Sequence, residues 1–255
     1  MFRLLFILFV SCTLTSCIQK KKEPFASKWL VAPLEEKEDA SLSSEFKEVL
    51  EQPFFFLGQG AQCYAFLGED GKTVLKLFKK DRKRFFWKKE KQGFKEASDA
   101  YKLAFKQLKE ETGLLYLHLN ESALNGKLTL IDEQKKVHRI YADETAFLLQ
   151  KRVELLPDYL DSLAGDRVAI EEVIQKFETF FIHRTKKGIT DPKQALRINY
   201  GFLDGQVVQL DPGKIYEDAA LKENSEAEIK RLIDHLHVWM DRKYNPTCPL
   251  SLPES

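Results

Sequence analysis

Short runs in which apolar and polar residues alternate dominate the first half of the chain, and such alternation is typical of strands with one buried face. Three runs follow one another between Phe54 and Phe78, separated by Gly58-Gln59-Gly60 and by Glu69-Asp70-Gly71-Lys72. Because short glycine-containing turns join antiparallel neighbours, the segment predicts three adjacent antiparallel strands. Together with the later apolar runs at 114–119, 128–131, 137–141 and 146–153, the pattern predicts a five-stranded antiparallel sheet.

A spacing of three to four residues between apolar positions predicts helices over 44–50, 94–108, 166–187 and 227–244. Before the last of them, Asp204-Gly205 is expected to join two short strands as a tight hairpin. In the helix at 94–108, extended backwards, Glu90 lies one turn before Phe94 on the apolar face. A carboxylate there is costly without a positive partner, so we expect a cation beside Glu90.

The first residues predict an export signal. An apolar run from Leu4 to Val10 follows Arg3 and is too short to span a bilayer. The sequence Leu14-Thr15-Ser16-Cys17 resembles the lipobox of bacterial lipoproteins, which implies a covalent lipid on Cys17 and attachment to the non-cytoplasmic face of a membrane. An ordinary signal peptide with an incidental Cys17 and a short apolar cytoplasmic start are the alternatives.

Overall charge narrows the choice of partners. Forty basic and thirty-nine acidic side chains give a net charge of +1, which predicts no nucleic-acid partner. The 44% hydrophobic content is typical of a globular chain. After Cys17 only Cys63 and Cys248 remain, too few for a disulfide scaffold or a zinc site, although a single bridge between them stays open.

Seven cations and three aromatic residues lie together between Lys79 and Lys89. This stretch suits an anionic lipid or a phosphorylated glycan. The alternative is a solvated helix start whose aromatic residues pack on the core.

The chain is expected to divide into five parts. These are a signal peptide at 1–16, a polar tether at 17–43, a sheet-containing N-terminal lobe at 44–153, a reduced and mainly helical C-terminal lobe at 154–244, and a tail at 245–255.

The order of these elements resembles the protein-kinase-like fold, an α+β architecture, from about Phe54 to Gly213. Gly58-x-Gly60 between two strands is similar to the loop that covers the nucleotide phosphates in kinases, and Val74-Leu75-Lys76 is similar to the V-A-I-K strand. The resemblance implies that Lys76 holds phosphates and pairs with Glu90.

The C-terminal lobe carries the rest of the resemblance. Asp191, Asn199 and Asp211-Pro212-Gly213 occur in the order of the kinase catalytic loop and magnesium motif. The family then implies Asp191 as the base, Asn199 and Asp211 as magnesium ligands, and ATP as the phosphate donor. Asp191 precedes Asn199 by eight residues where the motif has five, and proline replaces the phenylalanine of D-F-G.

Two functions follow from these features. The first is a membrane-tethered, Mg-ATP-dependent phosphotransferase acting on a small molecule, a glycan or a protein. The second is a catalytically inactive kinase-like module that binds a partner at the membrane surface. A lipoprotein faces compartments that normally lack ATP, which favours the inactive binding module. Retention of the polar residues that phosphotransfer needs favours the phosphotransferase.

Overall fold

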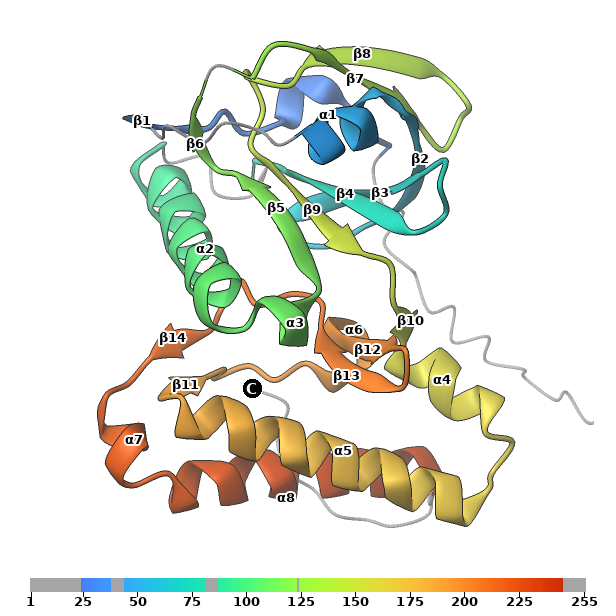
Figure 1. Cartoon of the computed structure of the whole chain (residues 1–255), viewed down its shortest axis with the longest axis vertical. Coiled ribbons are helices and arrows are strands. Elements are labelled where there is room, and N and C mark those ends of the chain that lie inside the picture. The colour runs from blue at the N-terminus through green and yellow to red at the C-terminus, as the bar shows by residue number, and fades with distance from the viewer. Residues whose placement is uncertain (1–23, 38–43, 81–86, 123, 245–255) are drawn as a thin grey trace, which may run out of the picture.

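The computed structural model describes residues 24–37, 44–80, 87–122 and 124–244 of the chain. It is a mixed α+β structure, with most of the sheet formed before residue 152 and most of the helices after it (Figure 1).

The main sheet has seven strands rather than the five that alternation predicts. Their order is β5-β9-β4-β3-β2-β7-β8. Neighbours are antiparallel except β2 and β7, which pair in parallel with Pro53 opposite Thr129. The sheet is larger than predicted because the run after Gly113 adds β5 at one edge and the later hairpin adds β7 and β8 at the other. The bounds are β2 Pro53–Gln59, β3 Cys63–Gly68, β4 Thr73–Phe78, β5 Leu114–His118, β7 Lys127–Ile131, β8 Val137–Tyr141 and β9 Phe147–Lys151.

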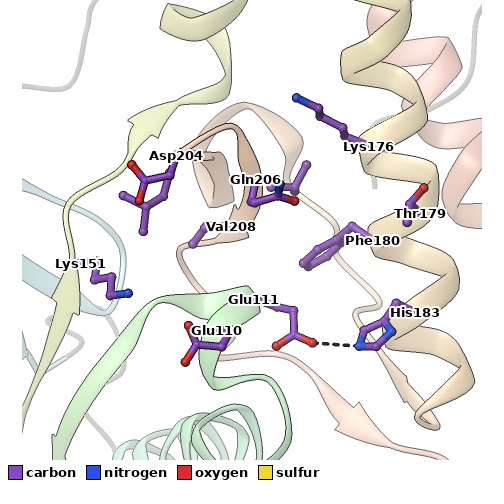
Figure 2. Close-up of a pocket in the computed structure, with 12 residues that line it drawn as sticks. Glu110, Glu111, Lys151, Lys176, Thr179, Phe180, His183, Asp204, Gln206 and Val208 are labelled. Atoms are coloured by element: carbon purple, nitrogen blue, oxygen red, sulfur yellow. Dashed lines mark ion pairs between the residues drawn. The ribbon is translucent and has the colours of Figure 1, made fainter.

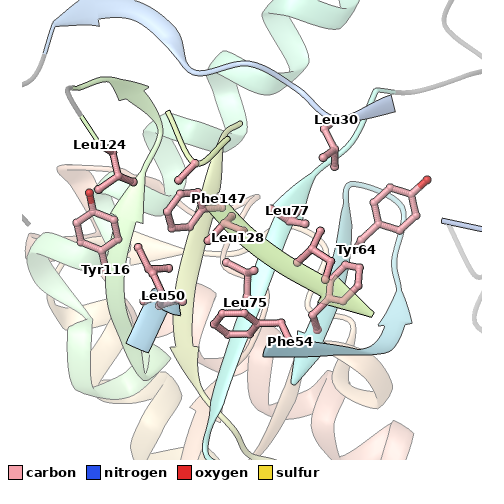
Figure 3. Close-up of a cluster of buried hydrophobic side chains, with 14 of the residues drawn as sticks. Leu30, Leu50, Phe54, Tyr64, Leu75, Leu77, Tyr116, Leu124, Leu128 and Phe147 are labelled. Atoms are coloured by element: carbon pink, nitrogen blue, oxygen red, sulfur yellow. The ribbon is translucent and has the colours of Figure 1, made fainter. Parts of the chain in front are cut away.

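One face of this sheet forms a hydrophobic core beneath the short helix α1 (Ser44–Glu51). Phe54, Leu75 and Leu77 are fully buried there, and Leu50 of the helix covers them (Figure 3). The opposite face carries Lys76. This residue pairs in register with Ala65, so the side chains of Lys76 and Ala65 point to the same face of the sheet. That second face looks toward the C-terminal half.

Helix α2 (Trp87–Gln107) packs through Ala97, Tyr101 and Ala104 against the sheet. The predicted helix ended at residue 108, but Leu108 leaves the helical conformation with a φ of −133° and becomes fully buried. A single further turn, α3 (Lys109–Thr112), follows, and Gly113 closes it with a φ of +61°. The left-handed conformation explains the glycine at this position.

The C-terminal half is built on two long helices, α5 (Arg167–Lys186) and α8 (Glu226–Tyr244). Asp166 caps α5 by accepting from the Val168 amide at 2.9 Å, as a helix start requires. The hairpin of β12 (Tyr200–Leu203) and β13 (Gln206–Gln209) lies between these helices and the main sheet (Figure 1). Smaller elements are α4 Leu156–Ser162, α6 Leu196–Asn199, α7 Ala220–Glu223, β10 Glu154–Leu155, β11 Ile189–Thr190 and β14 Tyr216–Glu217.

The predicted polar tether at 17–43 is partly folded. Residues 24–37 contain a short 3-10 helix, η1 (Ser27–Trp29), and strand β1 (Leu34–Lys37), which pairs with β6 (Asn120–Glu121). Phe25 and Leu30 are 5% and 9% exposed, because these isolated apolar residues enter the core of the sheet. The predicted signal peptide and tail lie outside the described residues. Within the described residues no helix combines the length and the apolarity needed to cross a bilayer.

Candidate functional site

Lys76 reaches from the central strand β4 toward the C-terminal half. Its Nζ atom donates to the Leu210 carbonyl at 2.6 Å, directly before Asp211. Burial lowers the pKa of Lys76, while the charge of Asp211 and that of Cys63 act in the opposite direction. The buried Gln150 of β9 donates to the same carbonyl at 3.2 Å. Lys76 is thereby held beside Asp211.

Asp211 follows β13, and α2 holds its carboxylate. Its Oδ1 atom accepts from the Tyr101 hydroxyl at 3.0 Å and from the Gly213 amide at 3.1 Å. Burial and the neighbouring charge of Asp211 raise the pKa of Tyr101 well above its ordinary value. Tyr101 therefore stays a hydrogen-bond donor near neutral pH.

The glycine-containing turn after β2 lies close to the segment that contains Asp211. A β-carbon added to Gly213 would lie 3.0 Å from Asp211 Oδ1 and 3.1 Å from Gln62 Oε1, so this turn reaches the Asp-Pro-Gly segment. Gly58 and Gly60 have no atoms within 4 Å of an added β-carbon, so the space around the turn is open. The Gly60 amide donates to the Cys63 carbonyl at 2.9 Å and closes the turn.

Asn199 ends α6 at the point where the β12–β13 hairpin begins. Its carbonyl accepts from the Leu210 amide at 2.7 Å, one step beyond the pair Tyr200 and Gln209. Asp204 and Gly205 form the predicted tight turn with positive φ values of 49° and 74°. The register brings Asn199 and Asp211 to the same end of this hairpin.

Asp191 is not a free carboxylate available beside Lys76 and Asp211. It is 1% exposed. Its Oδ1 atom accepts from the Lys193 amide at 2.9 Å, and its Oδ2 atom accepts from Gln209 Nε2 at 2.8 Å. Gln209 in turn accepts from the fully buried Arg184 at 2.9 Å. This chain of contacts gives Asp191 a structural role in the C-terminal half, and the role of base that the motif order implies stays a prediction.

Three other predicted features lie wholly or partly outside the described residues. Glu90 belongs to α2, but its side chain is not among those described, so its pairing with Lys76 stays a prediction. Cys17 and Cys248 also lie outside. Cys63 is a free thiol whose pKa burial and Asp211 raise to about 12.

A separate hollow of about 420 Å³ lies between α3, α5 and the β12–β13 hairpin. In Figure 2, Glu111 points toward His183 across it, and their charged atoms are 3.1 Å apart. The lining contains none of the predicted site residues. Glu111 is also 2.7 Å from Lys187, so its charge is used to join α3 and α5.

Sequence reasoning missed Tyr101 and Gln62. Tyr101 lies eleven residues after Glu90 in the sequence, close to three whole helical turns, and so on the same side of the helix. That spacing is a signal from which Tyr101 could have been found. No sequence signal points to Gln62, because only the folded turn brings Gln62 close to Gly213.

The oxygen ligands suit magnesium better than a softer metal. Magnesium is commonly held by one or two protein carboxylates together with substrate phosphates and water. Asp211 can supply one carboxylate, and the backbone of Asn199 lies at the same end of the hairpin through its bond to the Leu210 amide. Among the described residues no group of three His, Cys, Asp or Glu side chains converges as a metal site of its own. The residues present therefore fit a metal that arrives with phosphate.

No protein-family model matches this sequence, and no curated protein matches it significantly. Among solved structures, a crystal structure of WbdD shows 16% sequence identity and a TM-score of 0.45, covering 71% of this chain and 37% of that chain. A co-crystal structure of WbdD with the kinase inhibitor LY294002 gives 16% identity and a TM-score of 0.44 with the same coverage. A further structure describes WbdD as a bifunctional kinase-methyltransferase. The chain spans about 37% of the length of WbdD.

Proposed function

We propose that this protein is a kinase-like domain that binds magnesium and ATP between its sheet and its C-terminal half, held at a membrane surface through a lipid on Cys17. One observation carries the nucleotide site. Lys76, from the centre of the sheet, hydrogen-bonds the carbonyl immediately before Asp211. A positive clamp thus lies beside a carboxylate that can hold a metal, which is the pair that phosphate binding requires.

The sheet also offers an apolar surface on the Lys76 side. Phe55 pairs with Leu67, which pairs with Val74, two residues before Lys76, so these side chains share the face that carries Lys76. Phe55 is 38% exposed, and Leu57 near it is 52% exposed. A flat apolar ring such as a nucleobase would cover this surface and remove it from water.

Each residue of the cleft has a defined task in this proposal. Lys76 retains two ammonium protons beyond the one donated to Leu210 and can direct them at phosphate oxygens. Tyr101 and the Gly213 amide hold Asp211 Oδ1 and leave its other oxygen for a metal. Magnesium ATP, when bound, supplies the transferable phosphoryl group and the cation that offsets its charge.

The burial of Asp191 favours a second candidate, the binding module without phosphotransfer. Asp191 is 1% exposed and both of its carboxylate oxygens accept hydrogen bonds inside the C-terminal half, so a substrate hydroxyl has little access to it in this conformation. Phosphoryl transfer relies chiefly on positioning and electrostatics, so loss of a base slows the reaction and leaves binding intact. Both the phosphotransferase and the binding module should therefore bind nucleotide, and only the phosphotransferase should transfer phosphate.

Thermal unfolding of the full chain with and without Mg-ATP tests the proposal. Saturating nucleotide at 100 to 1,000 times the dissociation constant should stabilise the fold by about 3 to 4 kcal/mol. Asp211→Asn should abolish this gain and leave the nucleotide-free stability nearly unchanged, because it removes one anionic ligand at almost constant volume. No stabilisation of the wild type at millimolar nucleotide would exclude the site.

Asp204→Asn is the matched control, because Asp204 lies in the turn at the far end of the same hairpin. It should retain the full nucleotide response. Phosphate release or transfer, measured at the same nucleotide concentration, then distinguishes an active phosphotransferase from the binding module.

A further inference from the structure

One end of the main sheet gathers several turns of the chain. The turn from β2 to β3 lies between Gln59 and Cys63, and Cys63 pairs with Phe78 at the end of β4. β7 runs parallel to β2, so its turn into β8, from Ile131 to Val137, leaves the sheet in the same direction. We call residues 59–63, 78–80 and 131–137 the turn end.

The described chain begins at this turn end, and Phe25 fixes it there. The Phe25 amide donates to Glu133 Oε1 at 3.0 Å. Its ring lies edge-on to Tyr64 and His138, with centroids 5.0 Å away in each case. Phe25 is 5% exposed, so the start of the domain is a packed part of the structure.

This placement limits how far the turn end can lie from a lipid on Cys17. Only seven residue steps separate Cys17 from Pro24. A fully extended chain covers at most about 3.6 Å for each step, which gives a span of about 25 Å. The helices α5 and α8 lie on the other side of the β12–β13 hairpin from the main sheet (Figure 1). The turn end is therefore the part of the domain nearest to the anchored surface.

The charge of the turn end suits an anionic surface. Lys135 and Lys136 are exposed at the β7–β8 turn, and Lys80 is exposed just after β4. The seven cations of 79–89 begin at the same place in the sequence, and Lys20 to Lys22 lie within the connection to Cys17.

The acids of the β7–β8 turn are used internally. Asp132 Oδ2 is 2.7 Å from His138 Nε2, and its Oδ1 accepts from the amides of Gln134 and Lys136. Glu133 accepts from Phe25. These acids keep their negative charge and balance Lys135 and Lys136, so the positive excess of the turn end comes from Lys79 and Lys80.

We propose that the turn end docks on an anionic lipid bilayer, an inference that rests on the proposed lipid anchor at Cys17. Gln62, in the turn of this end, lies beside Gly213 and so close to Asp211, which places the proposed phosphate site on the membrane side. The acceptor of any phosphoryl transfer is then a group presented at the membrane surface.

Lysine acetylation read by mass spectrometry tests the docking surface. The full lipidated chain is reconstituted into vesicles of phosphatidylcholine alone or of phosphatidylcholine with phosphatidylglycerol, and flotation verifies attachment. Acetylation of Lys80, Lys135 and Lys136 should be several-fold slower on the anionic vesicles. The exposed Lys186 at the end of α5 is the internal control and should react equally on both. High salt should remove the protection, because it screens exposed charge.

The outcomes separate this inference from the functions on which it rests. Flotation with equal acetylation of all these lysines overturns the docking surface alone. Failure to float overturns the anchor and this inference together, whereas the Mg-ATP response is measured independently of both. Lys135→Glu with Lys136→Glu should abolish the protection of Lys80 if docking occurs, and Lys186→Glu should leave it intact. Unchanged protection in the double variant would also contradict the proposal.

Discussion

At the scale of single residues, Tyr101 links α2 to the carboxylate that the proposed site depends on. Its hydroxyl is buried and donates to Asp211 Oδ1 at 3.0 Å across 110 residues of sequence. The tyrosine thus makes a direct contact from α2 to Asp211, the metal ligand of the proposed site.

Tyr101→Phe should lower the free energy of unfolding by about 1 to 3 kcal/mol, because it removes one hydrogen bond to a charged group and keeps the ring. Urea denaturation measures this change. Tyr216→Phe, at a tyrosine that is 49% exposed, is the matched control and should change stability by less than about 0.5 kcal/mol. Equal stability of Tyr101→Phe and the control would show that the hydroxyl contributes nothing.

At the scale of elements, buried polar side chains connect α5, β12, β13 and the loop before α6, and the pattern of hydrophobic positions does not predict these contacts. Arg184 of α5 donates to Gln209 of β13, and Gln209 donates to Asp191 in the loop before α6. Arg184 also donates to the Tyr200 hydroxyl at 3.0 Å. These contacts hold the loop between β11 and α6 against the helical core.

Asp191→Ala should therefore destabilise the fold by about 3 kcal/mol with or without nucleotide, because the buried side-chain amide of Gln209 and the backbone amide of Lys193 lose their acceptor. Thermal and urea unfolding measure the loss. Asp158→Ala, at an exposed position in α4, should be nearly neutral. If Asp191→Ala abolished turnover and left stability intact, Asp191 would be the base that the motif order implies.

Glu111 connects α3 to α5 through Lys187, and this junction predicts a pH dependence. Burial tends to raise the pKa of Glu111, but the hydrogen bond and charge of Lys187, with the charge of His183, outweigh it and lower the pKa below 4.5. A carboxyl group with a lowered folded-state pKa contributes stability above its unfolded pKa and loses it as the pH falls. Unfolding free energy should thus decrease as the pH falls through about 4.5 toward the lowered pKa.

Glu111→Gln should flatten this decrease and cost about 1 kcal/mol near neutral pH. Lys187→Met should flatten it in the same way. If the two residues act as one pair, the double variant should show little further change in slope. Additive slopes would contradict the pairing.

At the scale of the whole molecule, the proposed attachment to a membrane determines which molecules could reach the site formed by Lys76 and Asp211. The lipobox at Leu14 to Cys17 predicts that Cys17→Ala moves the protein from the membrane fraction to the soluble fraction and removes the mass of the lipid. Fractionation and mass spectrometry measure both. Ser16→Ala keeps a small residue before the cysteine and should remain attached. Unchanged partition and mass for Cys17→Ala would refute lipidation.

The sequence alone determined the local features, because turns, caps and apolar periods depend on near neighbours. The Asp204-Gly205 hairpin, the long helix that begins near Asp166 and the order of Lys76, Asn199 and Asp211 were all readable in this way. Only the tertiary structure decided contacts between distant segments. The parallel pairing of β2 with β7, the burial of Phe25 and the Tyr101 contact to Asp211 depend on how elements pack. The same packing turns Asp191 toward Gln209, because a buried carboxylate requires donors that no local pattern specifies.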